Sequence, residues 1–278
     1  MLGSSGMLGS ELLRRAPAWA QVNAVSHRDV DVCEPGAVAR ALERTAADVV
    51  INATGYTRVD AAERETRLAM ALNSTAVGHI ARAGLAAGAR VVHFSTDYVF
   101  SGNAQRPYHE SGQTAPVNAY AQSKVSGEEA LRASGVPHLL IRTQWLFGIA
   151  GQSFPRTMWE RATTGKPTRV VNDQLGRPTY AVDLAHATWE LVRRGTTDTI
   201  HVANAGEASW YDVARRVFDS VGATALLTPC ATADYPTEAS RPAYSVLDTS
   251  RFDALTQATL PHWCDALDRF LIELSTRS

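Results

Sequence analysis

The sequence predicts an α/β fold, a doubly wound parallel sheet of the Rossmann type with helices on both faces. Three apolar runs rich in β-branched residues carry this prediction, because each follows a helical pattern and ends in polar residues: DVVINAT (48–54), RVVHFST (90–96) and HLLIRT (138–143). A glycine triplet, Gly3, Gly6 and Gly9, also stands just before the first helical pattern, as in a dinucleotide-binding turn. Strands that alternate with helices favour a parallel sheet covered on both sides.

The other elements follow from the same periodicities. They predict helices near residues 9–15, 35–45, 73–87, 119–134, 182–194, 210–221 and 261–274, and shorter strands over 21–26, 169–171 and 199–204. The stretch 228–242 contains several prolines and is expected to be a loop that could wall a pocket. Because the alternation loosens beyond Gly148, we expect a dinucleotide-binding Rossmann-type domain over 1–148. Residues 149–278 would form a smaller, mainly substrate-binding portion, with segments interleaved back onto the first domain.

Composition excludes several classes of function. The chain has 278 residues and a net charge of −1, which gives no electrostatic reason to expect nucleic acid or an anionic membrane surface as a partner. No apolar run approaches membrane-spanning length, and no basic-then-apolar leader is visible. The cysteines, Cys33, Cys230 and Cys264, are few, odd in number and far apart, which suits a reducing compartment. We therefore expect a cytoplasmic protein.

Only Met1 and Leu2 precede the glycine triplet, where a dinucleotide-binding unit has a whole strand. Glycines at this spacing also occur by chance and in ordinary turns, but the helix and short strand that follow favour the binding unit. The first strand is apparently truncated, through a start codon assigned too late or a trimmed chain, and Met1 and Leu2 should form at most its stub. The residues expected to receive the cofactor pyrophosphate are Gly3, Gly6, Met7, Leu8 and Gly9.

The residues after the 21–26 strand bear on the choice of cofactor. An NAD-specific enzyme usually has an acid there for the ribose hydroxyls, whereas a basic residue accommodates a 2′-phosphate. His27 and Arg28 therefore favour NADPH, and Asp29 lies close enough to keep NADH as the alternative. A solvated loop with one arginine is the other interpretation.

Tyr120 and Lys124 form the most informative pair in the sequence. They are four residues apart on a predicted helix, so both side chains project from one face. A nearby ammonium favours the phenolate and lowers the pKa of a phenol, which suits a tyrosine for proton transfer near neutral pH. Such pairs are common on solvent-facing helices. Here the pair follows the strand that ends in Ser95, Thr96 and Asp97, at the edge where doubly wound sheets bind ligands.

Motifs along almost the whole chain resemble the extended short-chain dehydrogenase/reductases, and within them the dTDP-4-dehydrorhamnose reductase family. The segments that carry the resemblance are GSSGMLG (3–9), NATGYTRVDAAE (52–63), FSTDYVFSG (94–102), YAQSK (120–124), RTQWLFG (142–148), DQLGRPT (173–179) and RPAYSVLDTSRF (241–252). They occur together and in the family's order, which makes the resemblance specific.

The resemblance implies roles for individual residues. Thr96, Tyr120 and Lys124 match the family's catalytic hydroxyl, tyrosine and lysine, and Tyr120 and Lys124 would also contact the cofactor. The positions that match the family's substrate contacts are Thr57, Val59, Asp97, Tyr98 and Trp145, and those beside the cofactor are Ala53, Thr54 and Gly55. Tyr98 and Trp145 could instead be core aromatics.

The implied activity is NADPH-dependent reduction of the C4 ketone of a nucleotide-linked 6-deoxy-4-ketohexose, with dTDP-4-dehydro-L-rhamnose giving dTDP-L-rhamnose. The alternatives are a reductase of another 4-keto sugar nucleotide and a non-catalytic, NADP-binding regulatory subunit. Some family members bind magnesium between subunits through acids that include one at the position of Glu11, so a homodimer is compatible with the resemblance. The other ligands cannot be located here, no metal ligand is assigned, and Glu11 is interpreted as a solvated acid on an exposed helix turn.

Overall fold

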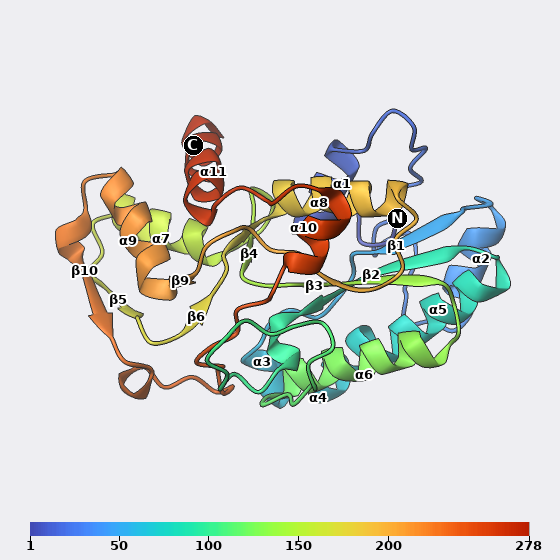
Figure 1. Cartoon of the computed structure of the whole chain (residues 1–278), viewed down its shortest axis with the longest axis horizontal. Helices are drawn as coiled ribbons and strands as arrows, with labels where there is room; N and C mark the ends of the chain where they lie inside the picture. Colours follow the sequence, from blue (N-terminus) through green and yellow to red (C-terminus); the bar gives the residue numbers. More distant parts are fainter. Residues whose placement is uncertain (278) are drawn as a thin grey trace.

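A four-stranded parallel sheet lies at the centre of the computed structural model, which describes residues 1–277 (Figure 1). Its order is β1-β2-β3-β8, and the strands span Val49–Asn52, Arg90–Thr96, His138–Thr143 and Asp198–His201. Val91 pairs with Val50 on one side and with His138 on the other, so β2 is an inner strand with a neighbour on each side. The predicted doubly wound α/β fold is confirmed.

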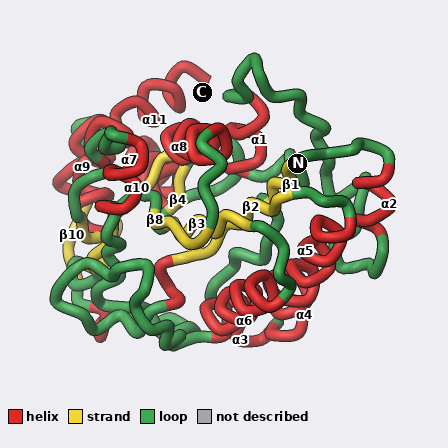
Figure 2. Tube along the Cα trace, turned by 45° about the vertical axis from the view of Figure 1, so that its right-hand side comes forward, coloured by secondary structure: helices red, strands yellow, loops and turns green. Residues whose placement is uncertain are grey.

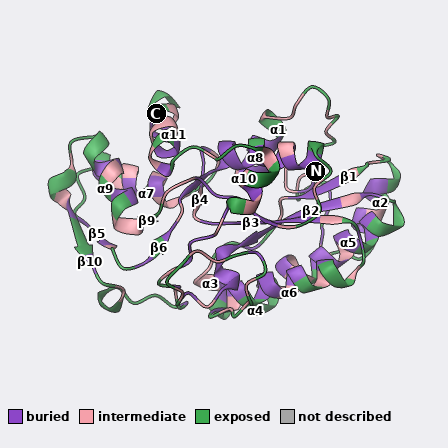
Figure 3. Ribbon diagram, viewed as in Figure 1, coloured by how far each residue is buried: buried purple, intermediate pink, exposed green. Residues whose placement is uncertain are grey.

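Helices cover both faces of the sheet, as Figures 1 and 2 show. One face packs against α2 (Ala37–Glu43), α5 (Ala76–Ala86) and α6 (Ala119–Ala133) through an apolar cluster that includes Val38, Ile80 and Leu131. The other face packs against α1 (Met7–Arg14) and α8 (Ala181–Arg193) through Leu12, Ile141 and Leu184. The strands are accordingly buried on both sides (Figure 3).

A second apolar cluster lies beyond the sheet, at the left of Figure 1. It joins residues of α7 (Phe154–Thr163), α9 (Trp210–Ser220) and α11 (Trp263–Arg277) with the parallel pair formed by β5 (Thr168–Val171) and β10 (Leu227–Cys230). The two short pairs nearby are β4 (Leu146–Phe147) with β7 (Thr179–Tyr180), and β6 (Leu175–Gly176) with β9 (Ala208–Ser209). The remaining helical pieces are α3 (Ala61–Arg64), α4 (Thr66–Met70), a π-helical turn (Ala71–Thr75), α10 (Ser250–Thr256) and 3₁₀ turns at 97–99, 224–226 and 232–234.

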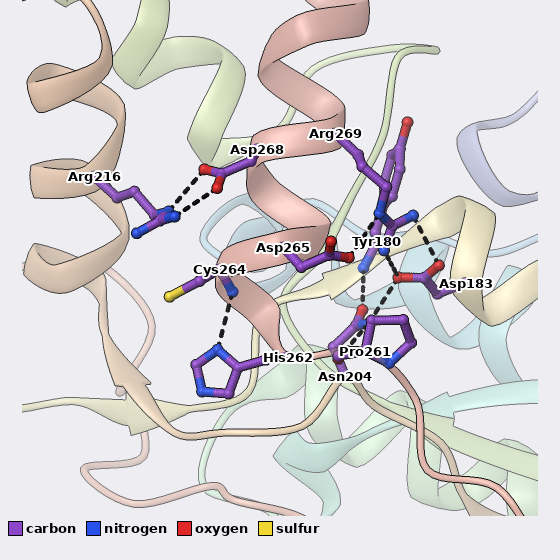
Figure 4. A network of polar contacts seen from close by, with 10 residues as sticks. All are labelled: Tyr180, Asp183, Asn204, Arg216, Pro261, His262, Cys264, Asp265, Asp268 and Arg269. Carbon is purple, nitrogen blue, oxygen red and sulfur yellow. Dashed lines mark hydrogen bonds and ion pairs between the residues drawn. The ribbon is translucent and has the colours of Figure 1, made fainter.

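A polar network ties α11 to the sheet region (Figure 4). Arg269 of α11 donates from both terminal nitrogens to Asp183 of α8, at 3.0 and 2.7 Å, and its guanidinium lies over the Tyr180 ring. The fully buried Asn204, just after β8, donates to Asp183 and accepts from the Tyr180 amide. The second cluster is thereby fixed against the sheet by charge-assisted hydrogen bonds as well as by apolar packing.

The amino end of the sheet is incomplete. Leu2 makes only isolated parallel bridges, to Val25 and to Asn52, so the prediction that Met1 and Leu2 form at most a stub is confirmed. The predicted strand over 21–26 is wrong except at Val25, because a strand needs a continuous neighbour and only Met1 and Leu2 supply one. The predicted loop over 228–242 is wrong at its start, since residues 227–230 form β10.

Within residues 1–277, no helix is both long enough and apolar enough to cross a membrane.

Candidate active site

A cavity of about 830 Å³ opens at the carboxyl ends of the strands, between the sheet and the second apolar cluster. Seven of the sequence-predicted residues line it: Thr57, Val59, Thr96, Asp97, Tyr98, Tyr120 and Trp145. This group contains all five predicted substrate contacts and two of the three predicted catalytic residues. Ligands of doubly wound folds bind at this edge of the sheet.

Thr96 ends β2 and organises the turn that follows. Its hydroxyl donates to Asp97 Oδ1 at 2.9 Å and accepts from the Tyr98 amide at 3.2 Å, which caps the 3₁₀ turn of residues 97–99. The Thr96 side chain is thus held in one place by the same turn that directs Asp97 and Tyr98 into the cavity.

Tyr120 lies in the first turn of α6. Asn118 caps this helix by accepting from the Ala121 amide at 2.8 Å, and its own amide donates to Ser240 O. The Tyr120 ring is buried and packs edge-to-face against Tyr98, with centroids 6.1 Å apart. Burial raises the pKa of Tyr120 to about 12, a shift that the Thr96 hydroxyl opposes and the Asp97 charge reinforces. Tyr120 is therefore a protonated phenol at neutral pH.

Lys124 lies one turn further along α6 and does not line the cavity. Its ammonium donates to the backbone oxygen of Phe94 at 2.6 Å, and burial lowers the pKa of Lys124 to about 8 while Glu128 opposes that shift. In this structure Lys124 is not among the groups that shift the pKa of Tyr120, because its ammonium is engaged at Phe94 O, and desolvation dominates the phenol.

Asp97, beside Thr96, is a second titratable group that faces the cavity. Its carboxyl group is buried, and Oδ2 has no hydrogen-bond partner among the described residues. Burial raises the pKa of Asp97 to about 7, against the opposing hydroxyls of Ser245 and Thr96. The group can therefore donate or accept a hydrogen bond near neutral pH.

Asn73, which the sequence did not single out, connects the predicted cofactor loop to α6. It lies in the π-helical turn, exchanges hydrogen bonds with the amide and carbonyl of Tyr56, and donates to Ser123 of α6. The two helical segments approach so closely here that a Cβ at Gly127 would stand 1.9 Å from Asn73 O. Asn73 thus positions the 53–57 loop relative to Tyr120. A π-helical turn at a functional site is a recurring feature that periodicity does not reveal.

The glycine loop has the geometry that a pyrophosphate needs. Gly3 is left-handed, with φ +78°, and a Cβ there would meet the backbone of Ala53 at 2.8 Å. A Cβ on Gly9 would lie 2.0 Å from Gly3 O, so the loop packs tightly against its helix. Gly6 precedes α1 without a side-chain cap, which leaves the amides of Met7, Leu8 and Gly9 available at the positive end of the helix. The residues present fit a dinucleotide.

His27 and Arg28 are exposed in the turn after Val25. Asp29 folds back on this turn, where its carboxylate accepts from the amide and the hydroxyl of Ser26, at 2.8 and 2.7 Å. These bonds lower the pKa of Asp29. The carboxylate is therefore engaged within the turn, and Arg28 is left facing solvent.

Trp145 forms an aromatic wall of the cavity. Its backbone is left-handed, with φ +47°, and its ring stacks on Trp210 with centroids 3.6 Å apart. A Cβ at Gly176 would come within 2.5 Å of this ring, so glycine is required beneath it. Trp145 is half-buried and lines the cavity while it packs against the second apolar cluster, and the buried Tyr98 likewise lines the cavity and packs in a core cluster.

Sequence reasoning missed much of the cavity's outer wall. The missed lining residues include Asp60, Phe154, Arg161, Arg169, Trp210, Tyr235 and Arg241. Several lie on α7, which was not predicted, and on the 228–242 loop, which was predicted only as a generic wall. Asp60 stands within the NATGYTRVDAAE motif and Arg241 within the RPAYSVLDTSRF motif, and these two positions were the available signals. Arg241 donates to Asp60 at 2.7 Å across the cavity mouth.

Glu11 is not the solvated acid expected from the sequence. Its side chain is 1% exposed, and its carboxylate accepts from Arg14 at 2.6 Å and lies 3.6 Å from Arg15. Packing of α1 against α8 buries it. Among the described residues, no group of three or more His, Cys, Asp or Glu side chains could hold a metal ion.

Comparison with known proteins agrees with this geometry. The family model described as "RmlD substrate binding domain" matches residues 1–276. The chain belongs to this family. The RmlD family includes a Salmonella typhimurium dTDP-4-dehydrorhamnose reductase that is 36% identical and aligns over 99% of this chain and 97% of its own length. A probable dTDP-4,6-dihydroxy-2-methyloxan-3-one 4-ketoreductase from Streptomyces antibioticus is 42% identical over 95% of this chain and 91% of its own.

A solved RmlD-type structure is closely superimposable. The dTDP-4-dehydrorhamnose reductase of Bacillus anthracis, determined in complex with NADP, matches with a TM-score of 0.94 and 30% identity, and covers 98% of this chain and 97% of its own. The reductase family expected from the sequence motifs is confirmed.

Proposed function

We propose that the chain is an NADPH-dependent reductase of a nucleotide-linked 6-deoxy-4-ketohexose, which converts dTDP-4-dehydro-L-rhamnose to dTDP-L-rhamnose. The observation that carries the proposal is the convergence of the Thr96 hydroxyl, the Tyr120 phenol and the Asp97 carboxyl on one cavity at the cofactor-binding edge of the sheet. The similarity to the Salmonella typhimurium dTDP-4-dehydrorhamnose reductase supports the choice of substrate.

The chain's own residues would orient the substrate and the cofactor and would donate a proton. When bound, NADPH supplies the hydride for the C4 carbonyl carbon. Tyr120, protonated at neutral pH, would give its proton to the oxygen that becomes the alcohol, and Thr96 would donate a hydrogen bond to the same oxygen. Lys124 would stabilise the resulting phenolate if its ammonium turned from Phe94 O toward Tyr120.

The cofactor would lie across the glycine loop. Gly3, Gly6 and the amides of Met7, Leu8 and Gly9 would hold the pyrophosphate, and the 53–55 backbone would pass beside the cofactor. We propose that His27 and Arg28 favour the 2′-phosphate of NADPH over NADH, because the Asp29 carboxylate is engaged at Ser26.

The substrate would occupy the rest of the cavity. Thr57, Val59, Asp97, Tyr98 and Trp145 would contact it, with residues 1–148 as the cofactor-binding domain and 149–278 as the mainly substrate-binding portion. We also propose that the enzyme works in the cytoplasm. We propose, in addition, that the enzyme is a homodimer.

A second candidate function stays within the same reaction class. The 42% identity to the Streptomyces 4-ketoreductase supports another 4-keto sugar nucleotide as substrate. A regulatory subunit that binds NADP without turnover is disfavoured by the intact Thr96, Tyr120 and Lys124.

Turnover distinguishes these candidates. In a panel of 4-keto sugar nucleotides, NADPH oxidation by the purified chain should be fastest with dTDP-4-dehydro-L-rhamnose, also called dTDP-6-deoxy-L-lyxo-4-hexulose. The Tyr120→Phe variant is the matched control. Faster turnover of another panel member would favour the second candidate. NADPH binding with no turnover of any panel member would favour the regulatory subunit.

A further inference from the structure

Glu128 lies on the same face of α6 as Tyr120 and Lys124, because the three residues are spaced four apart along the helix. Its side chain is fully buried, and it has no part in the reaction proposed above. Lys124 is also buried and lies one helical turn before it. A carboxylate is therefore enclosed in the protein next to the ammonium that serves Tyr120.

Arg142 of β3 fixes the Glu128 carboxylate in one position. The buried guanidinium donates from Nε to Glu128 Oε1 at 2.9 Å and from Nη2 to Glu128 Oε2 at 2.7 Å. Its third nitrogen, Nη1, donates to Glu110 O at 3.2 Å, and the group lies over the Phe100 ring. Burial acts to raise the pKa of Glu128, but the bonds from Arg142 outweigh it and lower that pKa below its ordinary value. Glu128 is thus an anion at neutral pH.

Arg132 contacts the same carboxylate from the solvent side. It lies one turn further along α6 and donates to Glu128 Oε2 at 3.0 Å, with its side chain 42% exposed. Water screens an exposed cation, so Arg132 contributes less to the site than the buried Arg142 does. Replacing Arg132 therefore changes the charge beside Glu128 while the buried ion pair stays intact.

Glu128 is the carboxylate that acts on Lys124. Burial lowers the pKa of Lys124 to about 8, and the Glu128 charge opposes that shift. From β2, the facing titratable group is His93, whose own pKa burial lowers well below its ordinary value, so it is uncharged at neutral pH. The turn after β2 carries Asp97, which faces the cavity, and the π-helical turn contributes the uncharged Asn73. An opposite charge beside a buried amine favours its charged form.

We propose that Glu128 is a positioning residue: its carboxylate, fixed by Arg142, keeps the buried Lys124 amine in its charged form. The inference rests on the proposed function, in which the Lys124 ammonium stabilises the Tyr120 phenolate after proton transfer. A neutral amine has no charge to offer the phenolate, so turnover falls at a pH where Lys124 has lost its proton. Glu128 would therefore set the upper pH limit of the reaction.

The chain has two lysines, Lys124 and Lys166, so each can be titrated directly by NMR. With carbon-13 at the lysine Cε positions, the purified chain should give one signal from each, and Lys166→Arg assigns them. Lys166 follows α7 and is exposed, which makes it the internal reference. In Glu128→Gln, the titration midpoint of Lys124 should fall by about one pH unit or more, while that of Lys166 stays in place.

Arg132→Gln is the matched control for the loss of a charge at this site. It removes a cation from the same carboxylate, so the Lys124 midpoint should not fall. A chain with both Glu128→Gln and Arg142→Gln keeps the test available if the single variant does not fold, because neither charge is then left unpaired. It should show the same fall. An unchanged Lys124 midpoint in the variant that folds would overturn the proposal, even if its melting temperature were lower.

Kinetics connect the charge of Lys124 to turnover. The high-pH limb of the kcat profile should move to lower pH by the same amount in Glu128→Gln, while KM for NADPH changes little. A shifted Lys124 midpoint with an unshifted limb would also overturn the proposal, because the charge would then not serve the reaction. A wild-type chain that turns over no 4-keto sugar nucleotide would refute the proposed function, and the Lys124 midpoint would still decide the role of Glu128.

Discussion

The carboxyl end of β2 and the amino end of β1 belong to one sheet, yet they leave different groups unsatisfied. At the carboxyl end, the polar groups that line the cavity are side chains, among them the buried Asp97, whose Oδ2 has no hydrogen-bond partner among the described residues, and the buried Tyr120 phenol. At the amino end they are backbone groups that face away from β2, the Val49 carbonyl and the Ile51 amide. Side chains of differing chemistry can select a small molecule by its functional groups, whereas a row of backbone groups selects another backbone. The carboxyl end therefore serves catalysis, whereas the amino end bears on stability. Each substitution proposed here changes one of the two ends.

The largest effect is expected at the catalytic end. Tyr120→Phe keeps the ring and its contact with Tyr98 but removes the proton donor, so hydride transfer should slow by about 10²–10⁴-fold. NADPH affinity and melting temperature should change little. Stopped-flow NADPH oxidation and a binding titration measure the two quantities. Turnover at the wild-type rate would assign proton donation to another group.

Asp97 should make the catalytic end sensitive to pH. Its pKa is raised to about 7 from an ordinary 3.8, so between these values the native state binds the extra proton and the free energy of unfolding falls as pH rises. The full shift corresponds to about 4 kcal/mol. Asp97→Asn should remove this contribution, so its stability relative to wild type should increase from pH 4 to pH 7 and then level off. Urea unfolding at each pH tests this, and a constant difference would refute it.

Leu140 and Leu2 belong to the same apolar cluster, but Leu140 lies in the middle of the sheet and Leu2 lies at its incomplete amino end. Leu140 is fully buried in β3, whereas Leu2 borders a cavity of about 520 Å³. Leu140→Ala should cost about 4 kcal/mol and Leu2→Ala about 2 kcal/mol, because Leu2 already lacks close neighbours on one side. Chemical denaturation measures both. A cost for Leu2 equal to that for Leu140 would show that the amino end is as well packed as the centre.

Arg28→Ala should have the smallest effect. It removes a contact that only the 2′-phosphate can make, so KM for NADPH should rise about tenfold while KM for NADH changes little. Steady-state kinetics with both cofactors test the difference. A similar rise in both KM values would remove Arg28 from cofactor selection.

The sequence predicted most closely those elements whose structure depends on local sequence. β2, β3 and α6 were predicted closely, because long apolar runs and a helical period each point to one structure. The segment 21–26 has strand composition but makes only one bridge, since strand formation depends on a neighbour that local sequence does not describe.

The inner site was predictable because its residues follow strand ends or share one helix face, as Thr96 and Tyr120 do. The outer wall was not, because Arg161, Trp210 and Arg241 come from distant segments that meet only through tertiary packing. The pKa of Tyr120 could not be predicted from the sequence either. The spacing between Tyr120 and Lys124 does not reveal that the Lys124 ammonium donates to Phe94 O.

The close approach between Gly127 and Asn73 should govern which sequences this fold tolerates. Gly78 and Gly127 both lie inside helices with ordinary backbone angles, but a Cβ at Gly78 would have only ordinary van der Waals neighbours at 3.4 Å or more. In a library randomised at both positions and selected for turnover, alanine should be accepted at 78, where it favours the helix. Position 127 should return glycine alone, although it touches no ligand, because any larger residue would wedge α6 away from Asn73 and carry Tyr120 with it.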